Sequence, residues 1–338
     1  MRRNFLKSAA AAGIGLAGTS AFAQQPAAAP AAAGGLRGNP SDVYVMNVMV
    51  SGVEYWFPVY EMMKQLGRTL GVRTRYTGTP EYDVNKQLAS FEQELARKPA
   101  GILLHPMQSD PFIEPINRAI DSGISVTTFA ADSPKSKRTA YITSDNVAEA
   151  KFAAEEIVKA LGGKGEYAVL ENPGQSNHDL RVTALIDYME RTHPDMKLVG
   201  RQATNQDSNA AYQAVAAMLQ ANPNLGALWI PEAGSAEGAV AAVLEAKKKV
   251  LILHADITPT TLEHIKQGNI HMSVNPNQGI QGFMGFMNTF LGAHPELIDP
   301  FNDYKVSGFN PMQIPSMDNG FAVITKANAA VGEYQALG

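Results

Sequence analysis

The stretch Arg138-Thr-Ala-Tyr-Ile-Thr-Ser-Asp-Asn146 decides the fold of this 338-residue chain. Residues 140–142 favour a short strand, and Ser, Asp and Asn are residue types that cap the start of a helix. A run with helical periodicity follows from Val147 to Leu161 and ends at two glycines. Strand–helix units precede this stretch, and a similar unit begins again at Gly165. The stretch therefore predicts a crossover between two similar lobes.

Strand and helix patterns alternate on both sides of this crossover. Short apolar runs rich in β-branched residues favour buried strands, and longer runs with apolar residues three or four apart favour helices. The expected strands are 43–50, 72–76, 101–105, 125–129, 166–170, 197–202, 226–230, 249–254 and 272–274. The expected helices are 55–70, 83–97, 110–120, 147–161, 178–192, 208–221, 234–246 and 278–291. This order predicts an α/β protein with one parallel sheet per lobe and helices on both faces of each sheet.

The first 23 residues have the pattern of an export signal. Two arginines, Arg2 and Arg3, precede a weakly apolar stretch, and Ala21-Phe22-Ala23 has the small-x-small form that signal peptidase cuts. The run from Arg2 to Lys7 resembles a twin-arginine signal, which exports folded proteins to the periplasm. An ordinary secretory signal that holds two arginines is the alternative. Gly13-Ile-Gly15-Leu-Ala-Gly18 matches a dinucleotide-binding pattern, but inside a removable signal it predicts no nucleotide site.

Composition sets further limits. Residues 24–41 are rich in Ala, Pro and Gly, which predicts a disordered linker. The chain has 28 basic and 32 acidic residues, and the signal removes only basic ones, so the positive charge that nucleic acids require is lacking. There is no cysteine, which excludes disulfides, thiolate catalysis and a lipidated cysteine. No apolar run after the signal reaches the about 18 residues that span a bilayer. We therefore expect a freely soluble periplasmic protein, without nucleic acid or stable membrane insertion.

The segments after the expected strands indicate binding of a polar ligand. Ligands of open parallel sheets bind at the carboxyl ends of the strands, and those segments carry aromatic, amide and acidic side chains and one arginine. The seven histidines form no i, i+4 pair of the kind that holds a metal. A nucleophile elbow and a phosphate loop are also absent from the sequence. The sequence predicts neither a cofactor nor a metal.

Six motifs occur in order between residues 42 and 325. They are Gly78-Thr-Pro-Glu-Tyr-Asp83, Gly101-Ile-Leu-Leu-His-Pro106, Ile124-Ser-Val-Thr-Thr-Phe129, Ala140-Tyr-Ile-Thr-Ser-Asp-Asn146, Leu219-Gln-Ala-Asn-Pro-Asn224 and Asp256-Ile-Thr-Pro-Thr-Thr-Leu262. In these motifs the chain resembles the ribose-binding-protein-like, sugar-binding family of periplasmic substrate-binding proteins, which serve ABC transporters. The resemblance implies the type I fold, two Rossmann-like lobes joined by a three-segment hinge. Repressors of the LacI type share this fold, but they begin with a helix-turn-helix.

The resemblance also implies the boundaries of the lobes. The N-terminal lobe is expected at 42–144 and 277–308, and the C-terminal lobe at 145–276 and 309–330. The three hinge connections are expected near 144–146, near 275–277 and near 307–311.

In the N-terminal lobe the resemblance implies an aromatic wall and a carboxylate. Tyr55 and Trp56 stand where the family stacks aromatic rings on a sugar, which excludes water from an apolar sugar face. The alternative is that Trp56 is only a core residue of the first helix. The family's aspartate after the fourth strand corresponds to Ala130, and Asp132, two residues later, is a shifted substitute.

In the C-terminal lobe the resemblance implies charged and amide contacts. Arg181 matches a sugar-contacting arginine, with a surface helix arginine as the alternative. Glu232 stands where the family has Asn or Asp, and Asp256 matches a sugar-binding aspartate, with capping of the next helix as its alternative role. Asn275 and Asn277 flank the position of a family amide. The ligand-contacting residues predicted from both lobes are thus Tyr55, Trp56, Asp132, Arg181, Glu232, Asp256, Asn275 and Asn277. Three histidines flank the same cleft, His105, His178 and His254. We expect them to be loop or core residues rather than residues that contact the ligand.

These assignments favour a monomeric solute receptor that delivers a sugar, polyol or sugar derivative to an ABC permease. A periplasmic sensor of the same fold, feeding a sensor kinase or chemoreceptor, is an alternative. Because Arg181 could pair with a ligand carboxylate, sugar acids and other small carboxylates are alternative ligands. A hydrolase that uses Asp132 and Glu232 as paired carboxylates is disfavoured, because two moving lobes would not fix their separation.

Overall fold

The computed structural model describes residues 36–297 and 312–330. The predicted signal, the linker up to residue 35 and the predicted third connection at 307–311 lie outside these residues. The end of the predicted linker is bonded to the first lobe, because the Gly38 N–H donates to the Leu70 carbonyl at 2.8 Å and Arg73 donates to the Ser41 carbonyl at 2.6 Å. The prediction of a disordered linker through residue 41 is therefore wrong for residues 38–41.

The described chain forms two six-stranded sheets with the same pattern of strand order. The first has the order β11-β5-β4-β3-β1-β2 and the second β12-β10-β9-β8-β6-β7, so β4 and β9 hold equivalent positions. The strands of the first sheet are β1 (Val43–Val48), β2 (Arg73–Gly78), β3 (Gly101–Leu104), β4 (Ser125–Phe129), β5 (Ala140–Thr143) and β11 (Ile314–Asp318). Those of the second are β6 (Gly165–Glu171), β7 (Met196–Ala203), β8 (Leu225–Ile230), β9 (Leu251–Ala255), β10 (Met272–Pro276) and β12 (Phe321–Thr325).

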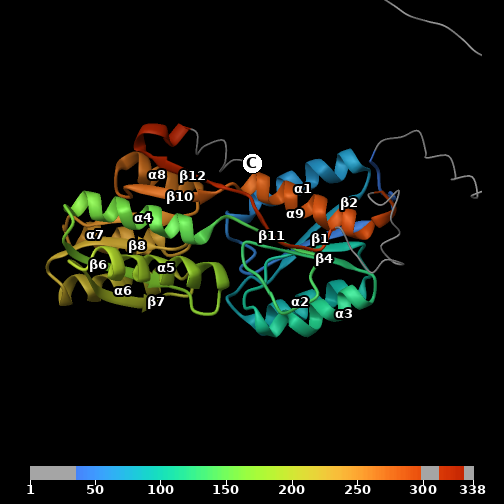
Figure 1. The fold of residues 1–338 in the computed structure, drawn as a ribbon, viewed down its shortest axis with the longest axis horizontal. Coiled ribbons are helices and arrows are strands. Elements are labelled where there is room, and N and C mark those ends of the chain that lie inside the picture. Colours follow the sequence, from blue (N-terminus) through green and yellow to red (C-terminus); the bar gives the residue numbers. More distant parts are fainter. Residues whose placement is uncertain (1–35, 298–311, 331–338) are drawn as a thin grey trace, which may run out of the picture. The chain divides into compact units, whose positions relative to one another are not determined.

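Helices cover both faces of each sheet (Figure 1). The first lobe holds α1 (Trp56–Leu70) and α9 (Gln278–Ala293) on one face, with α2 (Val84–Ala96), the short η1 (Asp110–Phe112) and α3 (Ile113–Asp121) on the other. The second lobe holds α4 (Asn146–Leu161) and α5 (Ser176–Thr192) on one face, with α6 (Ser208–Ala221), α7 (Ala236–Glu245) and α8 (Pro259–Gln267) on the other. Two further 3₁₀ turns are η2 (Pro295–Leu297) and η3 (Lys326–Asn328).

The strands are buried on both faces, which explains their almost continuous apolar sequences. Because side chains alternate along a strand, Tyr44 and Met46 of β1 join the core beneath α1 and α9, whereas Val45 joins the core beneath α2 and α3. In the described part of the chain every strand pairing is parallel except that of β10 with β12. The predicted fold class, two α/β lobes with mostly parallel sheets, is confirmed.

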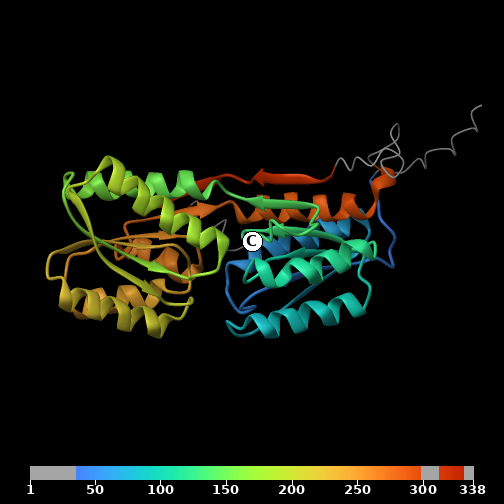
Figure 2. The ribbon, with the colours of Figure 1, turned by 60° about the horizontal axis from the view of Figure 1, so that its bottom comes forward.

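Three connections join the lobes and can be followed as the green, orange and red segments of Figures 1 and 2. The chain leaves the first lobe between β5 and α4 and returns to it between β10 and α9. Its third crossing lies between β11 and β12, at residues 319–320. The prediction that 309–330 belongs to the second lobe is therefore wrong for 314–318, because β11 pairs with β5 of the first sheet. β11 is short and half exposed, so it lacks the apolar signal of the other strands.

Candidate functional site

A small cavity lies where the carboxyl ends of both sheets meet. It is lined from the first lobe by Met49, Val53, Tyr55, Trp56, His105 and Ala130, and from the second by Asn177, His178, Gln206, Ala233 and Asp256. Its volume of about 20 Å³ is room for roughly one water molecule. A sugar therefore enters only if the lobes separate or the lining side chains move.

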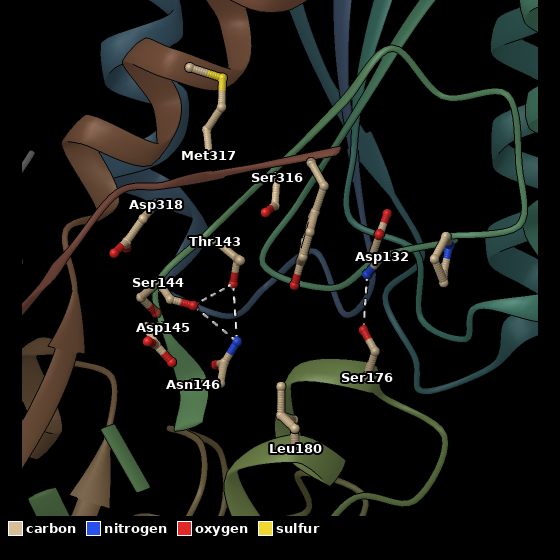
Figure 3. Close-up of a pocket in the computed structure, with 12 residues that line it drawn as sticks. Asp132, Thr143, Ser144, Asp145, Asn146, Ser176, Leu180, Ser316, Met317 and Asp318 are labelled. Carbon is tan, nitrogen blue, oxygen red and sulfur yellow. Dashed lines mark hydrogen bonds between the residues drawn. The ribbon is translucent and has the colours of Figure 1, made fainter. Parts of the chain in front are cut away.

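Contacts between the lobes close this cavity. The Asp132 N–H donates to Ser176 Oγ at 3.0 Å, a bond drawn in Figure 3. Gln175 Nε2 of the second lobe lies 3.3 Å from the Tyr82 hydroxyl and 3.0 Å from the Met49 sulfur of the first. The ligand would replace or join such contacts.

The two predicted aromatic residues form one wall of the cavity. Tyr55 precedes α1 and Trp56 begins it, and their rings meet edge to face at 5.0 Å between centroids. Trp56 is 3% exposed and also packs on His105, 4.6 Å away, and on Phe129. Trp56 is therefore both a cavity wall and a core residue, so its two predicted roles do not exclude each other. The Tyr55 hydroxyl donates to Gln281 Oε1 at 3.1 Å.

Asp132 does not line this cavity. Its carboxylate accepts from Arg138 through both oxygens and from the Thr128 hydroxyl at 2.6 Å. Ala130, the position directly after β4, lines the cavity instead, with φ at +57°. Arg138, in the segment that leads into β5, holds the Asp132 side chain, and the role of Asp132 as a shifted ligand carboxylate stays a prediction.

Asp256 supplies the carboxylate of the cavity from the second lobe. It follows β9 as Ala130 follows β4, has φ at +74°, and its N–H donates to the Val274 carbonyl at 2.9 Å. Burial raises the pKa of Asp256 to about 7, with Arg181 opposing the shift and Glu149 adding to it. Its Oδ1 accepts no hydrogen bond from any described residue. The helix that follows, α8, is capped by Thr258, which rules out capping as the role of Asp256.

Arg181 is buried beside the cavity, which contradicts its interpretation as a surface residue. It is 2% exposed, its Nε donates to Glu149 Oε2 at 2.7 Å, and its Nη1 donates to the Pro231 carbonyl at 2.9 Å. Asp256 Oδ1 lies 3.6 Å from Nη1. Burial lowers the pKa of Arg181, but the two carboxylates outweigh it and the pKa is raised. The guanidinium therefore stays charged.

Sequence reasoning missed Glu149, the closest partner of Arg181. Glu149 is fully buried on α4, on the same stripe as Ala150, Ala153 and Ile157. An acidic residue on the apolar face of a helix is the signal that could have found it, because a buried carboxylate requires a partner.

The remaining predicted residues lie beside the cavity rather than on it. Glu232 is 1% exposed, and its Oε2 accepts from the N–H groups of Gly234 and Ser235 at the start of α7. Burial raises the pKa of Glu232. Asn275 is fully buried in β10. Asn277 Nδ2 donates to the Asn319 carbonyl at 3.1 Å, which ties the second connection to the third.

Three histidines near the cleft are uncharged. Burial lowers the pKa of His105 and of His254 to about 3, and it lowers the pKa of His178 well below its usual value. His178 Nδ1 lies 3.2 Å from Asn172 Nδ2, and His254 Nδ1 lies 3.3 Å from Ser273 Oγ. His105 and His178 line the cavity, whereas His254 is a core residue of β9.

A larger pocket, of about 470 Å³, lies beside the first connection (Figure 3). Asn146 Nδ2 donates there to Thr143 Oγ1 at 3.1 Å and to the Ser144 carbonyl at 3.2 Å, which holds the connection. The Asp145 and Asp132 side chains that line it are likewise bonded, to the start of α4 and to Arg138. We place the candidate ligand site in the smaller cavity, where buried polar atoms lack partners and both sheets end.

Within the described ranges, no cluster of His, Asp and Glu could hold a metal ion. In the same part of the chain no helix combines the length and the apolar composition needed to cross a bilayer.

Residues 43–290 match the periplasmic binding protein domain, and the chain belongs to this family. The chain is 28% identical over 243 residues to the D-allose-binding periplasmic protein of Escherichia coli (strain K12), a match covering 68% of this chain and 78% of that protein. It is 26% identical to the D-apiose import binding protein of Paraburkholderia graminis, over 73% of this chain and 76% of that protein.

Comparison with solved structures also indicates a sugar-binding protein fold. The arabinose-binding protein AraP of Geobacillus stearothermophilus superposes with a TM-score of 0.74 at 28% identity, over 86% of this chain and 99% of AraP. The predicted resemblance to sugar-binding periplasmic proteins of ABC transporters is confirmed.

Proposed function

We propose that this chain is a periplasmic solute receptor that binds a sugar, polyol or sugar derivative between its lobes and delivers it to an ABC permease. Relatives named for binding allose, apiose and arabinose support the ligand class. The observation that carries the proposal is the cavity at the carboxyl ends of both sheets, with the Trp56 ring on one side and the Asp256 carboxylate on the other.

The two sides of the cavity suit the two faces of a sugar. The C–H face of a sugar ring packs on an aromatic ring such as Trp56, which removes water from both. The hydroxyl rim requires acceptors, and Asp256 Oδ1 and Asn177 Oδ1 are buried acceptors without a hydrogen bond from any described residue. Each charge-assisted bond to Asp256 is stronger than its neutral counterpart.

The family and the relatives are binding proteins, and we infer that this chain binds its ligand without turning it over. Asp132 and Glu232 support this inference, because each carboxylate is already engaged, with Arg138 and with the start of α7 respectively. We also propose that it acts as a monomer.

A thermal-shift screen against neutral sugars and polyols tests the binding function, because a ligand that binds only the native state raises the melting temperature. Titration calorimetry then gives the affinity, and recovery of unchanged ligand tests the absence of turnover. Transport is separated from sensing by adding the loaded receptor to its permease in liposomes and measuring ATP hydrolysis. No response of the permease to the loaded receptor would favour the sensor.

We further propose that Arg2 and Arg3 direct export of the folded protein. Replacing both with lysine should leave the precursor in the cytoplasm, because the twin-arginine route depends on the arginine pair. Cell fractionation and immunoblotting measure this. An unchanged periplasmic yield would indicate the unfolded-chain route instead.

A further inference from the structure

Among the described residues, the buried charges beside the cavity include no cation that lacks a carboxylate partner. Arg181 is the cation at this site, and two carboxylates already face it, Glu149 at 2.7 Å and Asp256 at 3.6 Å. All three residues are more than nine-tenths buried. Glu232 adds a third buried carboxylate whose charge raises the pKa of Asp256. The three nearby histidines are neutral, so they add no positive charge.

Buried polar atoms on the cavity that receive no hydrogen bond also indicate which ligands fit, although Asp256 Oδ1 lies 3.6 Å from Arg181 Nη1. Within the described chain, the cavity-lining residues with a buried polar atom that has no hydrogen bond are Asp256 (Oδ1), Asn177 (Oδ1) and His105 (Nδ1). Asn177 Oδ1 can only accept, and Asp256 Oδ1 can only accept when the carboxyl is ionised. A buried acceptor that stays unpaired costs about 1–3 kcal/mol, so a ligand that donates to these oxygens removes this cost. A ligand carboxylate offers further acceptors and leaves them unpaired.

We propose that the site selects a ligand whose polar groups are hydroxyls or an ammonium group, with no acidic group, and that Glu149 sets this selectivity by compensating Arg181. This inference rests on the proposed receptor function and narrows its ligand class. A sugar acid would place a further negative group near one guanidinium that two buried carboxylates already face. Such like-charge contacts in a buried interface cost several kcal/mol.

Matched sets of ligands test the selectivity. One set is D-glucose, D-glucosamine and D-glucuronate, and a second has the galactose configuration. Each affinity is measured by calorimetry at pH 7.5 and low salt. We expect the acid to bind at least about 100-fold more weakly than the neutral or amino member, since each 1.4 kcal/mol is tenfold. The amino sugar controls for a general intolerance of charge.

The outcomes separate the two proposals. An acid that binds as tightly as its neutral counterpart overturns the selectivity while the receptor function stands. No binding by any member of the sets contradicts the receptor function itself, and this inference with it.

The variant Glu149→Gln tests whether the charge of Glu149 sets the selectivity. Removing this negative charge should shift the ratio of acid to neutral affinity toward the acid by about tenfold or more. Glu156→Gln, on the same helix but paired only with the exposed Lys159, is the matched control and should leave the ratio unchanged. Glu149→Asp keeps the charge and should behave like the wild type, which separates charge from packing. An unchanged ratio in Glu149→Gln would overturn the role of Glu149, and the ligand sets on the wild type test the selectivity even where this variant does not fold.

Discussion

Arg181 shows how one residue serves both the fold and the site. Its guanidinium neutralises Glu149 inside the second lobe and faces Asp256 at the cavity. Sequence comparison with the family predicts a ligand contact, but the two carboxylates and the Pro231 carbonyl show that it also holds α4, α5 and the end of β8 together. Replacing Arg181 is therefore expected to lower the stability of the fold as well as the affinity for the ligand.

Arg181→Ala should lower the free energy of unfolding by about 3–5 kcal/mol, because it leaves the Glu149 carboxylate buried without its partner. Urea unfolding followed by circular dichroism measures this. Arg191→Ala on the same helix is the control, since its pair with Asp187 is exposed and surface pairs contribute about 0–1 kcal/mol. Similar losses in both variants would contradict the structural role of Arg181.

Asp256 should make stability depend on pH. Its pKa is about 7 in the folded protein against an ordinary value of 3.8, so between these values the folded chain binds more protons than the unfolded chain. The contribution of Asp256 to the free energy of unfolding therefore falls as pH rises from about 4 to 7. Asp256→Asn removes this contribution. The stability of the variant relative to the wild type should rise across that window by up to about 1.4 kcal/mol per pH unit.

Urea unfolding at pH 4.5 and pH 7.5 checks this expectation. Asp187→Asn, at a side chain that is 59% exposed, is the control and should show no such change between the two pH values. If the free energies of unfolding of Asp256→Asn and the wild type differ by the same amount at both pH values, the raised pKa of Asp256 is contradicted.

At the scale of elements, the sequence predicted the helices and the buried strands, because local residue patterns determine them. Asp145 accepts from the first N–H groups of α4, as its position before an apolar periodic run indicates, and Asp83 caps α2 in the same way. The alternation of strands and helices predicted both sheets because buried parallel strands are nearly continuous apolar runs. β11 could not be predicted in this way, because its few half-exposed residues are held by pairing with β5.

The candidate site was less predictable because long-range partners decide it. Tyr55, Trp56 and Asp256 were found, since each directly follows a strand or starts a helix at the carboxyl edge of a sheet. Asp132 lies at the same edge, but its carboxylate is paired with Arg138. No sequence pattern around Asp132 predicts this ion pair. Asn177 and Gln206 reach the cavity from second-lobe segments whose sequences carry no family motif.

The cap of α4 has a second role, since it fixes the first connection between the lobes. Asp145→Ala should lower the free energy of unfolding by about 0.5–2 kcal/mol, the usual value of a helix cap. Asp83→Ala removes an equivalent cap from α2, which is no part of a connection, and should cost a similar amount.

Hydrogen exchange distinguishes the two variants. Only Asp145→Ala should speed exchange at residues 147 and 148, because the N–H groups of these two residues donate to the Asp145 carboxylate. Equal exchange at this connection in both variants would show that Asp145 caps the helix without restraining the hinge.

For the whole molecule, the size of the cavity requires a change between empty and loaded states. About 20 Å³ cannot hold a sugar, and we expect the lobes to rotate apart for entry, which breaks the contacts of Ser176 with Asp132 and of Gln175 with Tyr82. Only the three short connections can absorb this rotation, because the helices on either side of them are packed into their own lobes. The ligand then favours the closed state by touching both lobes.

Trp56 should report this closure. The chain has two tryptophans, and Trp229 is a fully buried core residue of the second lobe that does not line the cavity. In Trp229→Phe the fluorescence comes from Trp56 alone, and a bound sugar should change its intensity and wavelength because the ring exchanges water for a C–H face. Small-angle scattering in the same titration should show a smaller radius of gyration. A sugar that binds tightly and changes neither signal would mean that the lobes do not close on it, and a permease could not then distinguish loaded from empty receptor by their orientation.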